Sequence, residues 1–356
     1  MKHRMDIIKK SFLIFSAIFL YNCPMDYDSE LRISITASSP SQDSIYIRWE
    51  TEVAMQSYKI FRQSHITREY EYLATINNND NSYLDIGLHP STKYSYKIAY
   101  IDSNNKERFI DSSFFAVTQP HLIAHRGFWG FDGIVENTIR SLQAAADLGV
   151  YGSEFDVHIT TDNIPVVYHD FIGMYGLIQQ LPYSEIKYVA LSNGERPPSL
   201  DDYLEAGKTL SIQLILEIKP HATPARDREV AQIVTDRVKY FGLEDRVDYI
   251  TFSLDVGKEL IRLQPDSNVG YLKGDLTPAE LKKYGFSTLS YDYGVIRDHP
   301  KYLNEAKELG LITAVWTVND LSVMESMNNQ GITFITTDIP LQAKEYFEQK
   351  VYQYNF

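Results

Sequence analysis

Charged residues two positions apart follow apolar runs at two places in the chain. Glu154 and Asp156 lie in GSEFDVH, and Glu217 and Lys219 lie in LILEIKP. Because side chains two apart on a β-strand point to the same side, each pair would line one face of a sheet. Buried carboxylates need a compensating partner, and an all-oxygen ligand set suits calcium or magnesium. The spacing therefore predicts a divalent-metal site formed by Glu154, Asp156 and Glu217.

Two histidines also end apolar runs, His125 beside Arg126 in LIAHRG and His169 beside Asp170 in PVVYHD. Histidine titrates near neutral pH, so one imidazole could accept a proton from a nucleophile while the other protonates a leaving alkoxide. Arg126 and Lys219 would add fixed positive charge, and cations beside a metal favour a phosphate ligand. Each motif alone is more often a solvated strand or a turn. Their joint occurrence predicts a phosphate site with acid–base chemistry.

The elements that would position these residues follow Gln119 and Pro120. Eight strand-like runs, from LIAHRG at 122–127 to ITFITTD at 332–338, alternate with amphipathic stretches, several of which end in glycine. This count predicts a (β/α)8 TIM barrel over residues 119–356, with its site at the C-terminal ends of the strands. A doubly wound open sheet is the alternative, but HRGFWGFDG lacks the glycine spacing of a nucleotide loop.

Residues 31–118 show a period of two, with turn residues between short runs, which predicts an all-β sandwich. The segment resembles a fibronectin type III module, with Trp49 on the second strand and a Leu-x-Pro-x-Thr-x-Tyr-x-Tyr pattern from Leu88 to Tyr96. Tyr94 would be the tyrosine corner. Such a module serves either as a spacer, the interpretation that we favour, or as a contact surface for a protein or glycan.

The N-terminal residues 1–23 combine a basic head with an apolar segment at 11–22. This segment is too short to span a bilayer, which takes roughly twenty apolar residues, and it predicts a secretory signal. LYNC resembles the lipobox of bacterial lipoproteins, which implies acylation of Cys23, the single cysteine of the chain. The lipid would then anchor the protein in the outer membrane of the bacterial cell envelope, with the protein facing either the periplasm or the cell surface. The alternative is an ordinary signal; residues 24–30 would form a linker.

Composition agrees with a multidomain globular protein. The 356 residues are 44% hydrophobic and 23% charged, and this length favours two domains. The net charge of −13 argues against nucleic-acid binding, which calls for a basic face.

The motifs between His121 and the C-terminus resemble, in order, those of the glycerophosphodiester phosphodiesterases, a (β/α)8 family. They are HRG, ENT, Glu-x-Asp, PVVYHD, LEIK, VWTVN and ITTDIP. The resemblance implies metal-dependent hydrolysis of a glycerophosphodiester to glycerol 3-phosphate and an alcohol, with either water or the glycerol 2-hydroxyl as the attacking group. It also implies that His125 and His169 are the acid–base pair, and that Arg126 and Lys219 hold the phosphate.

The resemblance further implies supporting roles for Glu136 and Asn137 of ENT at the edge of the site. Glu136 would orient His125 or Arg126, or face the metal. Trp316 would form an apolar wall for the glycerol moiety or belong to the core.

Two loops depart from the family pattern. One is the aromatic loop FWGF at 128–131, and the other is FIGMYGL after Asp170. The aromatic loop indicates a headgroup or acyl chain that differs from that of glycerophosphocholine. Two other functions stay open: cleavage of intact phospholipid, as by a phospholipase C or sphingomyelinase D, and non-catalytic surface binding.

Overall fold

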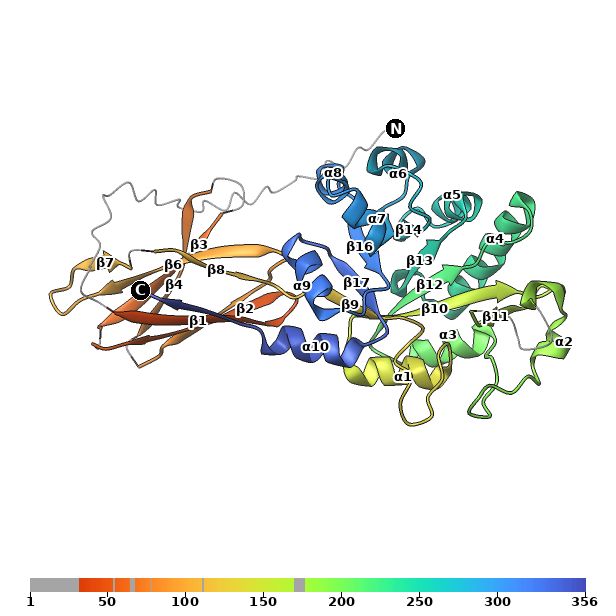
Figure 1. Cartoon of the computed structure of the whole chain (residues 1–356), viewed down its shortest axis with the longest axis horizontal. Helices are drawn as coiled ribbons and strands as arrows, with labels where there is room; N and C mark the ends of the chain where they lie inside the picture. The colour runs from red at the N-terminus through yellow and green to blue at the C-terminus, as the bar shows by residue number, and fades with distance from the viewer. Residues whose placement is uncertain (1–31, 54, 65–67, 78, 111, 170–176) are drawn as a thin grey trace, which may run out of the picture.

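The computed structural model describes residues 32–53, 55–64, 68–77, 79–110, 112–169 and 177–356. The predicted signal 1–23 with Cys23, the linker 24–30, Asp170 and residues 171–176 of the FIGMYGL loop lie outside the described residues. An N-terminal body of two antiparallel sheets is followed by a barrel of parallel strands (Figure 1). None of the helices in the described ranges is long and apolar enough to cross a membrane.

Eight parallel strands close into a ring in the C-terminal body. The ring closes where the last strand pairs with the first, with Phe334 opposite His121 and Thr337 opposite Ala124. The closed ring confirms the predicted barrel and excludes the open sheet. In order, the strands are β9 (His121–Ala124), β10 (Gly152–Ile159), β12 (Gln213–Ile218), β13 (Val247–Thr251), β14 (Val269–Tyr271), β15 (Thr288–Asp292), β16 (Ile312–Trp316) and β17 (Phe334–Thr337).

Helices connect successive strands and cover the outside of the ring (Figure 1). Thr138, Ser199 and Thr277 show how the sequence starts several of them, because each side chain accepts a backbone N–H of the first turn. The helices are α1 (Ile139–Leu148), α2 (Tyr183–Ile186), α3 (Leu200–Lys208), α4 (Pro224–Phe241), α5 (Leu254–Leu263), α6 (Pro278–Tyr284), α7 (Tyr293–Asp298), α8 (Tyr302–Glu308), α9 (Leu321–Asn329) and α10 (Pro340–Gln349), with short 3-10 turns at Ile178–Gln180 and Glu244–Arg246.

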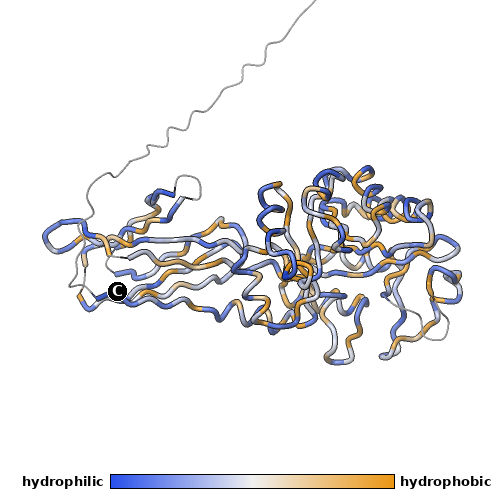
Figure 2. The backbone as a smooth tube through the Cα atoms, turned by 45° about the horizontal axis from the view of Figure 1, so that its top comes forward, coloured by the Kyte–Doolittle hydropathy of each residue, from blue (hydrophilic) through white to orange (hydrophobic). Residues whose placement is uncertain are grey.

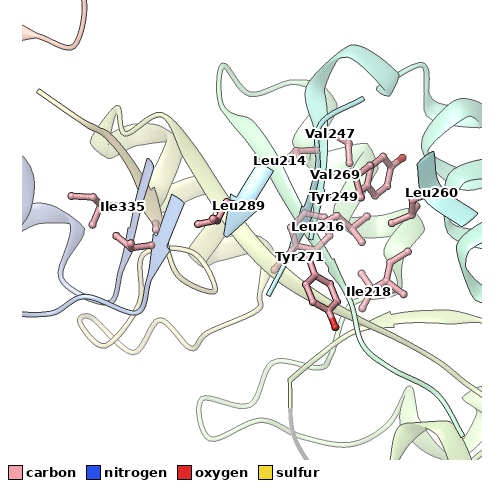
Figure 3. Close-up of a cluster of buried hydrophobic side chains, with 14 of the residues drawn as sticks. Leu214, Leu216, Ile218, Val247, Tyr249, Leu260, Val269, Tyr271, Leu289 and Ile335 are labelled. Atoms are coloured by element: carbon pink, nitrogen blue, oxygen red, sulfur yellow. The ribbon is translucent and has the colours of Figure 1, made fainter. Parts of the chain in front are cut away.

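Strand β12 shows how alternation places the polar residues. Leu214, Leu216 and Ile218 belong to the buried cluster between the ring and its helices, with Leu260 of α5 (Figure 3). Because successive side chains point to opposite sides of a strand, Glu217 faces the barrel interior. Strand β10 behaves in the same way, and past the ring its far end pairs antiparallel with β11 (Pro165–Val167).

The two N-terminal sheets enclose a core of their own. Trp49 and Tyr58, from different sheets, pack with ring centroids 5.1 Å apart. The alternation that predicted these strands is visible along the chain (Figure 2). One sheet contains β1 (Ile33–Ser41), β2 (Ser44–Thr51) and β5 (Ser82–Ile86); the other contains β3 (Ser57–Gln63), β4 (Tyr70–Asn77), β6 (Lys93–Ile101), β7 (Glu107–Phe109) and β8 (Phe114–Val117).

The last strand of the chain corrects the predicted domain boundary at residue 356. β18 (Val351–Asn355) follows α10 but pairs antiparallel with β1, with Tyr354 opposite Ile35 (Figure 1). The Tyr354 hydroxyl donates to the carbonyl oxygen of Phe115 at 2.6 Å. The end of the segment assigned to the barrel is therefore the edge strand of an N-terminal sheet.

The connection between the two bodies is short and buried. Thr118 and Gln119, which follow β8, are 0% and 8% exposed. The backbone N–H of Gln119 donates to Ser39 Oγ at 3.0 Å, and Thr118 Oγ1 donates to the carbonyl oxygen of His89 at 2.6 Å. The chain crosses between the bodies twice, here and between α10 and β18.

Candidate active site

The three acids of the predicted metal site converge at the end of neighbouring strands. Asp156 on β10 stands opposite Glu217 on β12 in the parallel register, and Glu154 lies two residues before Asp156. All three are buried, and one carboxylate oxygen of each lies within 4.8 Å of the others. This is the arrangement that the alternation on the two strands predicts.

Burial and mutual repulsion perturb these carboxyl groups. Burial, together with the negative charges of Asp156 and Glu217, raises the pKa of Glu154 well above its usual value. Burial also raises the pKa of Glu217 to about 7, with Asp156 adding to the rise and Lys219 opposing it. Burial alone would raise the pKa of Asp156 as well, but Lys219, His169 and Asn137 outweigh it, so this pKa is lowered. Asp156 is therefore the most acidic of the three.

The acid cluster fits a hard divalent cation. Glu154 Oε1 is buried and accepts no hydrogen bond from any part of the chain that the structure describes. When Glu154 is ionised, such an oxygen needs a positive ligand, and a set of carboxylate oxygens is what calcium and magnesium prefer. Glu154, Asp156 and Glu217 are the residues that would hold the ion.

Lys219 supplies positive charge to the same cluster. Its Nζ lies 2.7 Å from Asp156 Oδ1 and 2.7 Å from Glu217 Oε1. The side chain is itself nearly buried, so the ammonium group faces the acids with little competition from solvent. Lys219 therefore compensates part of the charge that the three carboxylates carry.

Arg126 is held in position by its backbone and by its guanidinium group. Its N–H donates to Glu154 Oε2 at 2.8 Å, and its Nη1 donates to both carboxylate oxygens of Glu136 at 3.0 and 3.1 Å. Of the orientations predicted for Glu136, the structure shows the contact with Arg126. Nε of Arg126 lies 3.7 Å from Asp156 Oδ2, so the guanidinium extends over the acid cluster.

The turn after Arg126 requires glycine. Arg126 and Gly127 both have positive φ, 58° and 82°. A Cβ atom on Gly127 would lie 2.4 Å from Ser141 Oγ at the start of α1, which no side chain could tolerate. The HRG motif therefore allows the strand end to turn tightly against α1.

Asn137 links the next turn to the acid cluster. Its Nδ2 donates to Asp156 Oδ2 at 2.8 Å, and its Oδ1 accepts the backbone N–H of Asp156 at 3.0 Å. The residue is 1% exposed and has a φ of 56°. This reciprocal pair orients the Asp156 carboxylate.

His125 has a partner that the sequence reasoning did not assign. Its Nδ1 lies 2.6 Å from Asp338 Oδ1, just beyond β17. Asn319, just beyond β16, donates to Asp338 Oδ2 at 2.7 Å and accepts the backbone N–H of Asp338 at 2.9 Å. Burial opposes the change, but hydrogen bonds from His125 and Asn319 lower the pKa of Asp338. With Nδ1 facing the Asp338 carboxylate, Nε2 is the ring nitrogen that faces the acid cluster, 4.0 Å from Glu154 Oε2.

His169 follows β11 and belongs to the same end of the barrel. It lies close enough to Asp156 to lower the pKa of that carboxyl group. Its carbonyl oxygen lies 3.0 Å from Nε2 of His158, a residue that the sequence analysis did not single out. The two histidines of the predicted pair thus approach the acid cluster from β9 and from β11.

The remaining predicted residues lie near the end of β16 and in the aromatic loop. Trp316 is half-buried, donates to the carbonyl oxygen of Ser290 at 3.1 Å and packs edge-on against Phe252. In the loop, Phe128 and Phe131 pack with centroids 4.2 Å apart, and Trp129 Nε1 donates to the carbonyl oxygen of His125 at 2.9 Å. The aromatic loop is therefore anchored to the backbone of His125.

Comparisons with known proteins agree with this site. Residues 125–342 match the glycerophosphoryl diester phosphodiesterase family. The chain is similar to a glycerophosphodiester phosphodiesterase from Parabacteroides distasonis whose crystal structure is known, with 47% sequence identity and a TM-score of 0.63. The match covers 64% of this chain and 96% of the Parabacteroides chain. A glycerophosphodiester phosphodiesterase from Caldanaerobacter subterraneus is 27% identical over 237 residues, 62% of this chain and 94% of the relative.

A third comparison concerns the fold alone. An Oleispira antarctica phosphodiesterase, whose structure is a complex with the product sn-glycerol-3-phosphate, has 24% identity and a TM-score of 0.57, and covers 65% of this chain and 97% of its own.

The closed (β/α)8 barrel with acids, histidines and cations at its strand ends is that of a phosphoric diester hydrolase. The chain belongs to the glycerophosphoryl diester phosphodiesterase family.

Proposed function

We propose that the chain hydrolyses glycerophosphodiesters to glycerol 3-phosphate and an alcohol at this end of the barrel. The main support is the cluster of Glu154, Asp156 and Glu217, in which one carboxylate oxygen of each lies within 4.8 Å of the others and Arg126 and Lys219 both approach Asp156. Three acids compensated by two cations form a site for a metal-bound phosphate group, and the family acts on glycerophosphodiesters.

Glu154, Asp156 and Glu217 would hold calcium or magnesium, and a divalent metal is general in the family. When bound, the cation polarises a phosphoryl oxygen and stabilises the negative charge that develops on it. Arg126 and Lys219 would bind the other phosphate oxygens, because both reach the acid cluster with positive groups. Asn137 and Glu136 would keep Asp156 and Arg126 in place.

His125 and His169 would carry the protons. The oxygen of the attacking hydroxyl bonds to phosphorus, its proton passes to one imidazole, the bond from phosphorus to the alcohol oxygen breaks, and the other imidazole protonates the alkoxide. The contact of His125 Nδ1 with Asp338 supports a role for Nε2 in this exchange. A carboxylate at Nδ1 also stabilises the imidazolium when Nε2 takes up the proton.

The aromatic loop supports a substrate with an apolar or bulky group. Phe131, next to the paired ring of Phe128, is one of the exposed large hydrophobic residues, and Trp129 ties the loop to His125. We propose that the loop contacts the leaving alcohol. Trp316 would contact the glycerol side, because it ends β16 and is only half-buried.

We also propose that the N-terminal body is a fibronectin type III-like spacer and that acylated Cys23 anchors the chain in the bacterial cell envelope. Support comes from the Tyr94 hydroxyl, which accepts the backbone N–H of His89 at 2.8 Å, as a tyrosine corner does. The LYNC motif and the basic, apolar head support the anchor. Radiolabelled fatty acid should be incorporated into the full chain, and Cys23→Ser should abolish its incorporation.

The activity is tested with residues 24–356 as a purified protein. Glycerophosphocholine, glycerophosphoethanolamine, glycerophosphoinositol and phosphatidylinositol are each supplied with chelator, with calcium and with magnesium. We expect release of glycerol 3-phosphate that the chelator abolishes and one of the two cations restores. Turnover of the intact phospholipid alone would support a phospholipase instead. No turnover of any diester, with no metal bound, would support a binding protein.

A further inference from the structure

Two histidines that the proposed reaction does not use lie at the mouth of the barrel. His158 is two residues beyond Asp156 on β10, and His221 follows Lys219 and Pro220 after β12. Their ring centroids are 6.4 Å apart. His158 is only 7% exposed, so its ring nitrogens must find partners within the protein.

The partners of His158 determine which nitrogen carries its proton. Gln179 Nε2 lies 3.0 Å from His158 Nδ1 and 2.9 Å from the carbonyl oxygen of Pro220. A carbonyl oxygen can only accept, so the amide of Gln179 is a donor here and Nδ1 of His158 accepts from it. The proton of the neutral ring therefore sits on Nε2, which donates to the carbonyl oxygen of His169 at 3.0 Å.

His221 shows the same arrangement beside Lys219. Its Nε2 accepts the backbone N–H of Ile159 at 3.3 Å, so Nδ1 carries the proton and donates to the carbonyl oxygen of Lys219 at 2.8 Å. The backbone N–H of His221 in turn donates to Asp227 Oδ1 on α4 at 2.7 Å. The end of β12 that carries Lys219 is thus fixed to both β10 and α4.

These bonds form one connection between two groups of the proposed site. It runs from Lys219 through Pro220 to Gln179, then through His158 to His169. Strand β11 has only three residues and ends at Val167, so sheet pairing stops before His169. A buried imidazole with one accepting and one donating nitrogen bridges this gap with fixed geometry.

We propose that His158, oriented by Gln179, is a positioning residue that sets the distance of the His169 imidazole from the phosphate held by Lys219. This inference rests on the proposed function, because His169 is taken there as one of the two acid–base groups. The effect is on alignment, where displacements of about 1 Å can cost on the order of 100-fold in rate. We expect substrate and metal affinity to stay unchanged, since both ring nitrogens of His158 are bonded within the protein, to Gln179 and to the carbonyl oxygen of His169.

The test compares two substitutions at His158 with a matched control. His158→Leu removes both ring nitrogens at similar volume, whereas the amide of His158→Gln can still donate to His169 and accept from Gln179. The control is His121→Leu, which removes another partly buried histidine from the start of β9, at the opposite end of the barrel. We expect His158→Leu to lower kcat roughly 10- to 100-fold, with KM and metal affinity within about two-fold of wild type.

The conservative variant His158→Gln should recover most of kcat, and His121→Leu should keep wild-type kcat despite any loss of stability. Wild-type kcat in His158→Leu, or a kcat in His158→Gln as low as in the leucine variant, would overturn the inference. A wild-type protein without phosphodiesterase activity would refute the proposed function instead. In that case ring ¹⁵N spectra decide: an Nε2–H tautomer at His158 supports the positioning contact, and an Nδ1–H tautomer refutes it.

Discussion

Nδ1 of His125 lies 2.6 Å from Oδ1 of Asp338, a residue 213 positions further along the chain. The contact joins the ends of the first and last strands of the barrel, which are neighbours because the ring closes. Asn319, beyond the adjacent strand, holds the other oxygen of Asp338. Residues at the ends of three consecutive strands of the ring therefore orient the imidazole so that Nε2 faces Glu154.

Replacing Asp338 with asparagine should keep a hydrogen bond to Nδ1 of His125 but change which ring nitrogen carries the proton. An amide at this position can donate to Nδ1, which moves the ring proton to Nε2 and blocks its use as a base. We expect Asp338→Asn to lower kcat roughly 100- to 10,000-fold with little change in melting temperature, measured by steady-state kinetics and calorimetry. Asp320→Asn, a neighbouring acid that caps α9, is the control and should behave as wild type. Full activity in Asp338→Asn would contradict the proposed role of His125.

Metal binding and turnover should be lost in different variants. Glu217→Gln removes one ligand of the acid cluster and should abolish the cation-dependent rise in melting temperature along with activity. His169→Ala should keep that rise but lose roughly 100- to 10,000-fold in kcat, because it removes only proton transfer. Glu205→Gln, on the exposed side of α3, controls for the change of charge. Unchanged cation response and unchanged kcat in both site variants would show that the site lies elsewhere.

Binding of the cation should release protons near neutral pH. The pKa of Glu217 is raised to about 7, so below that pH the metal-free site holds a proton that the ion must displace. Affinity for calcium or magnesium should therefore rise with pH by up to about one decade per unit per proton released. Titration calorimetry in two buffers of different ionisation enthalpy measures the number of protons. Affinity that is the same at about pH 6 and about pH 8 would contradict this reading.

His121 should make the fold sensitive to mild acid. Burial lowers its pKa from 6.5 to about 4, so between these values the unfolded chain binds a proton that the folded protein does not. The stability that the neutral ring contributes is therefore complete above pH 6.5 and falls as the pH drops toward 4. The expected slope is up to about 1.4 kcal/mol per pH unit. Urea unfolding at several pH values should show a shallower decline in His121→Leu than in wild type; equal declines would refute the assignment.

A chain that ends at Lys350 should leave the edge of β1 unpaired. β18 covers that edge from Val351 to Asn355, so its removal exposes a row of backbone donors and acceptors that favours self-association. We expect a lower melting temperature and concentration-dependent oligomers in sedimentation velocity. Tyr354→Phe is the matched control, since it keeps the strand and removes only the bond to Phe115, worth about 1 kcal/mol. A truncated protein as stable and monomeric as the full chain would count against this role of β18.

The barrel and its acid cluster could be predicted because both follow from the spacing of residues that are close together in the sequence. Glu154 with Asp156, and Glu217 with Lys219, follow the period of a strand, and the eight predicted runs correspond to the eight strands of the ring. The contact of His125 with Asp338 could not be predicted in this way, because it depends on closure of the barrel. Asp338 reaches His125 only once β17 pairs with β9, and no periodicity reports that contact.

β18 was missed for a related reason. The sequence VYQYN alternates as an edge strand does. However, a segment of five residues after a helix could pair with the edge of more than one sheet, and its actual partner β1 lies at the other end of the described sequence. His158 was overlooked because its role lies in a bond to the backbone of His169, which side-chain spacing alone does not reveal.

The return of β18 to β1 also affects how the protein is made. Strands β1, β2 and β5 of the first N-terminal sheet are synthesised before the barrel, yet the fourth strand of that sheet, β18, is translated only after all eight barrel strands. During that interval a nascent chain carries an open hydrogen-bonding edge, which a chaperone or a second nascent chain could occupy. A product that breaks off inside the barrel never closes the edge, so proteolytic quality control could recognise it from its first domain.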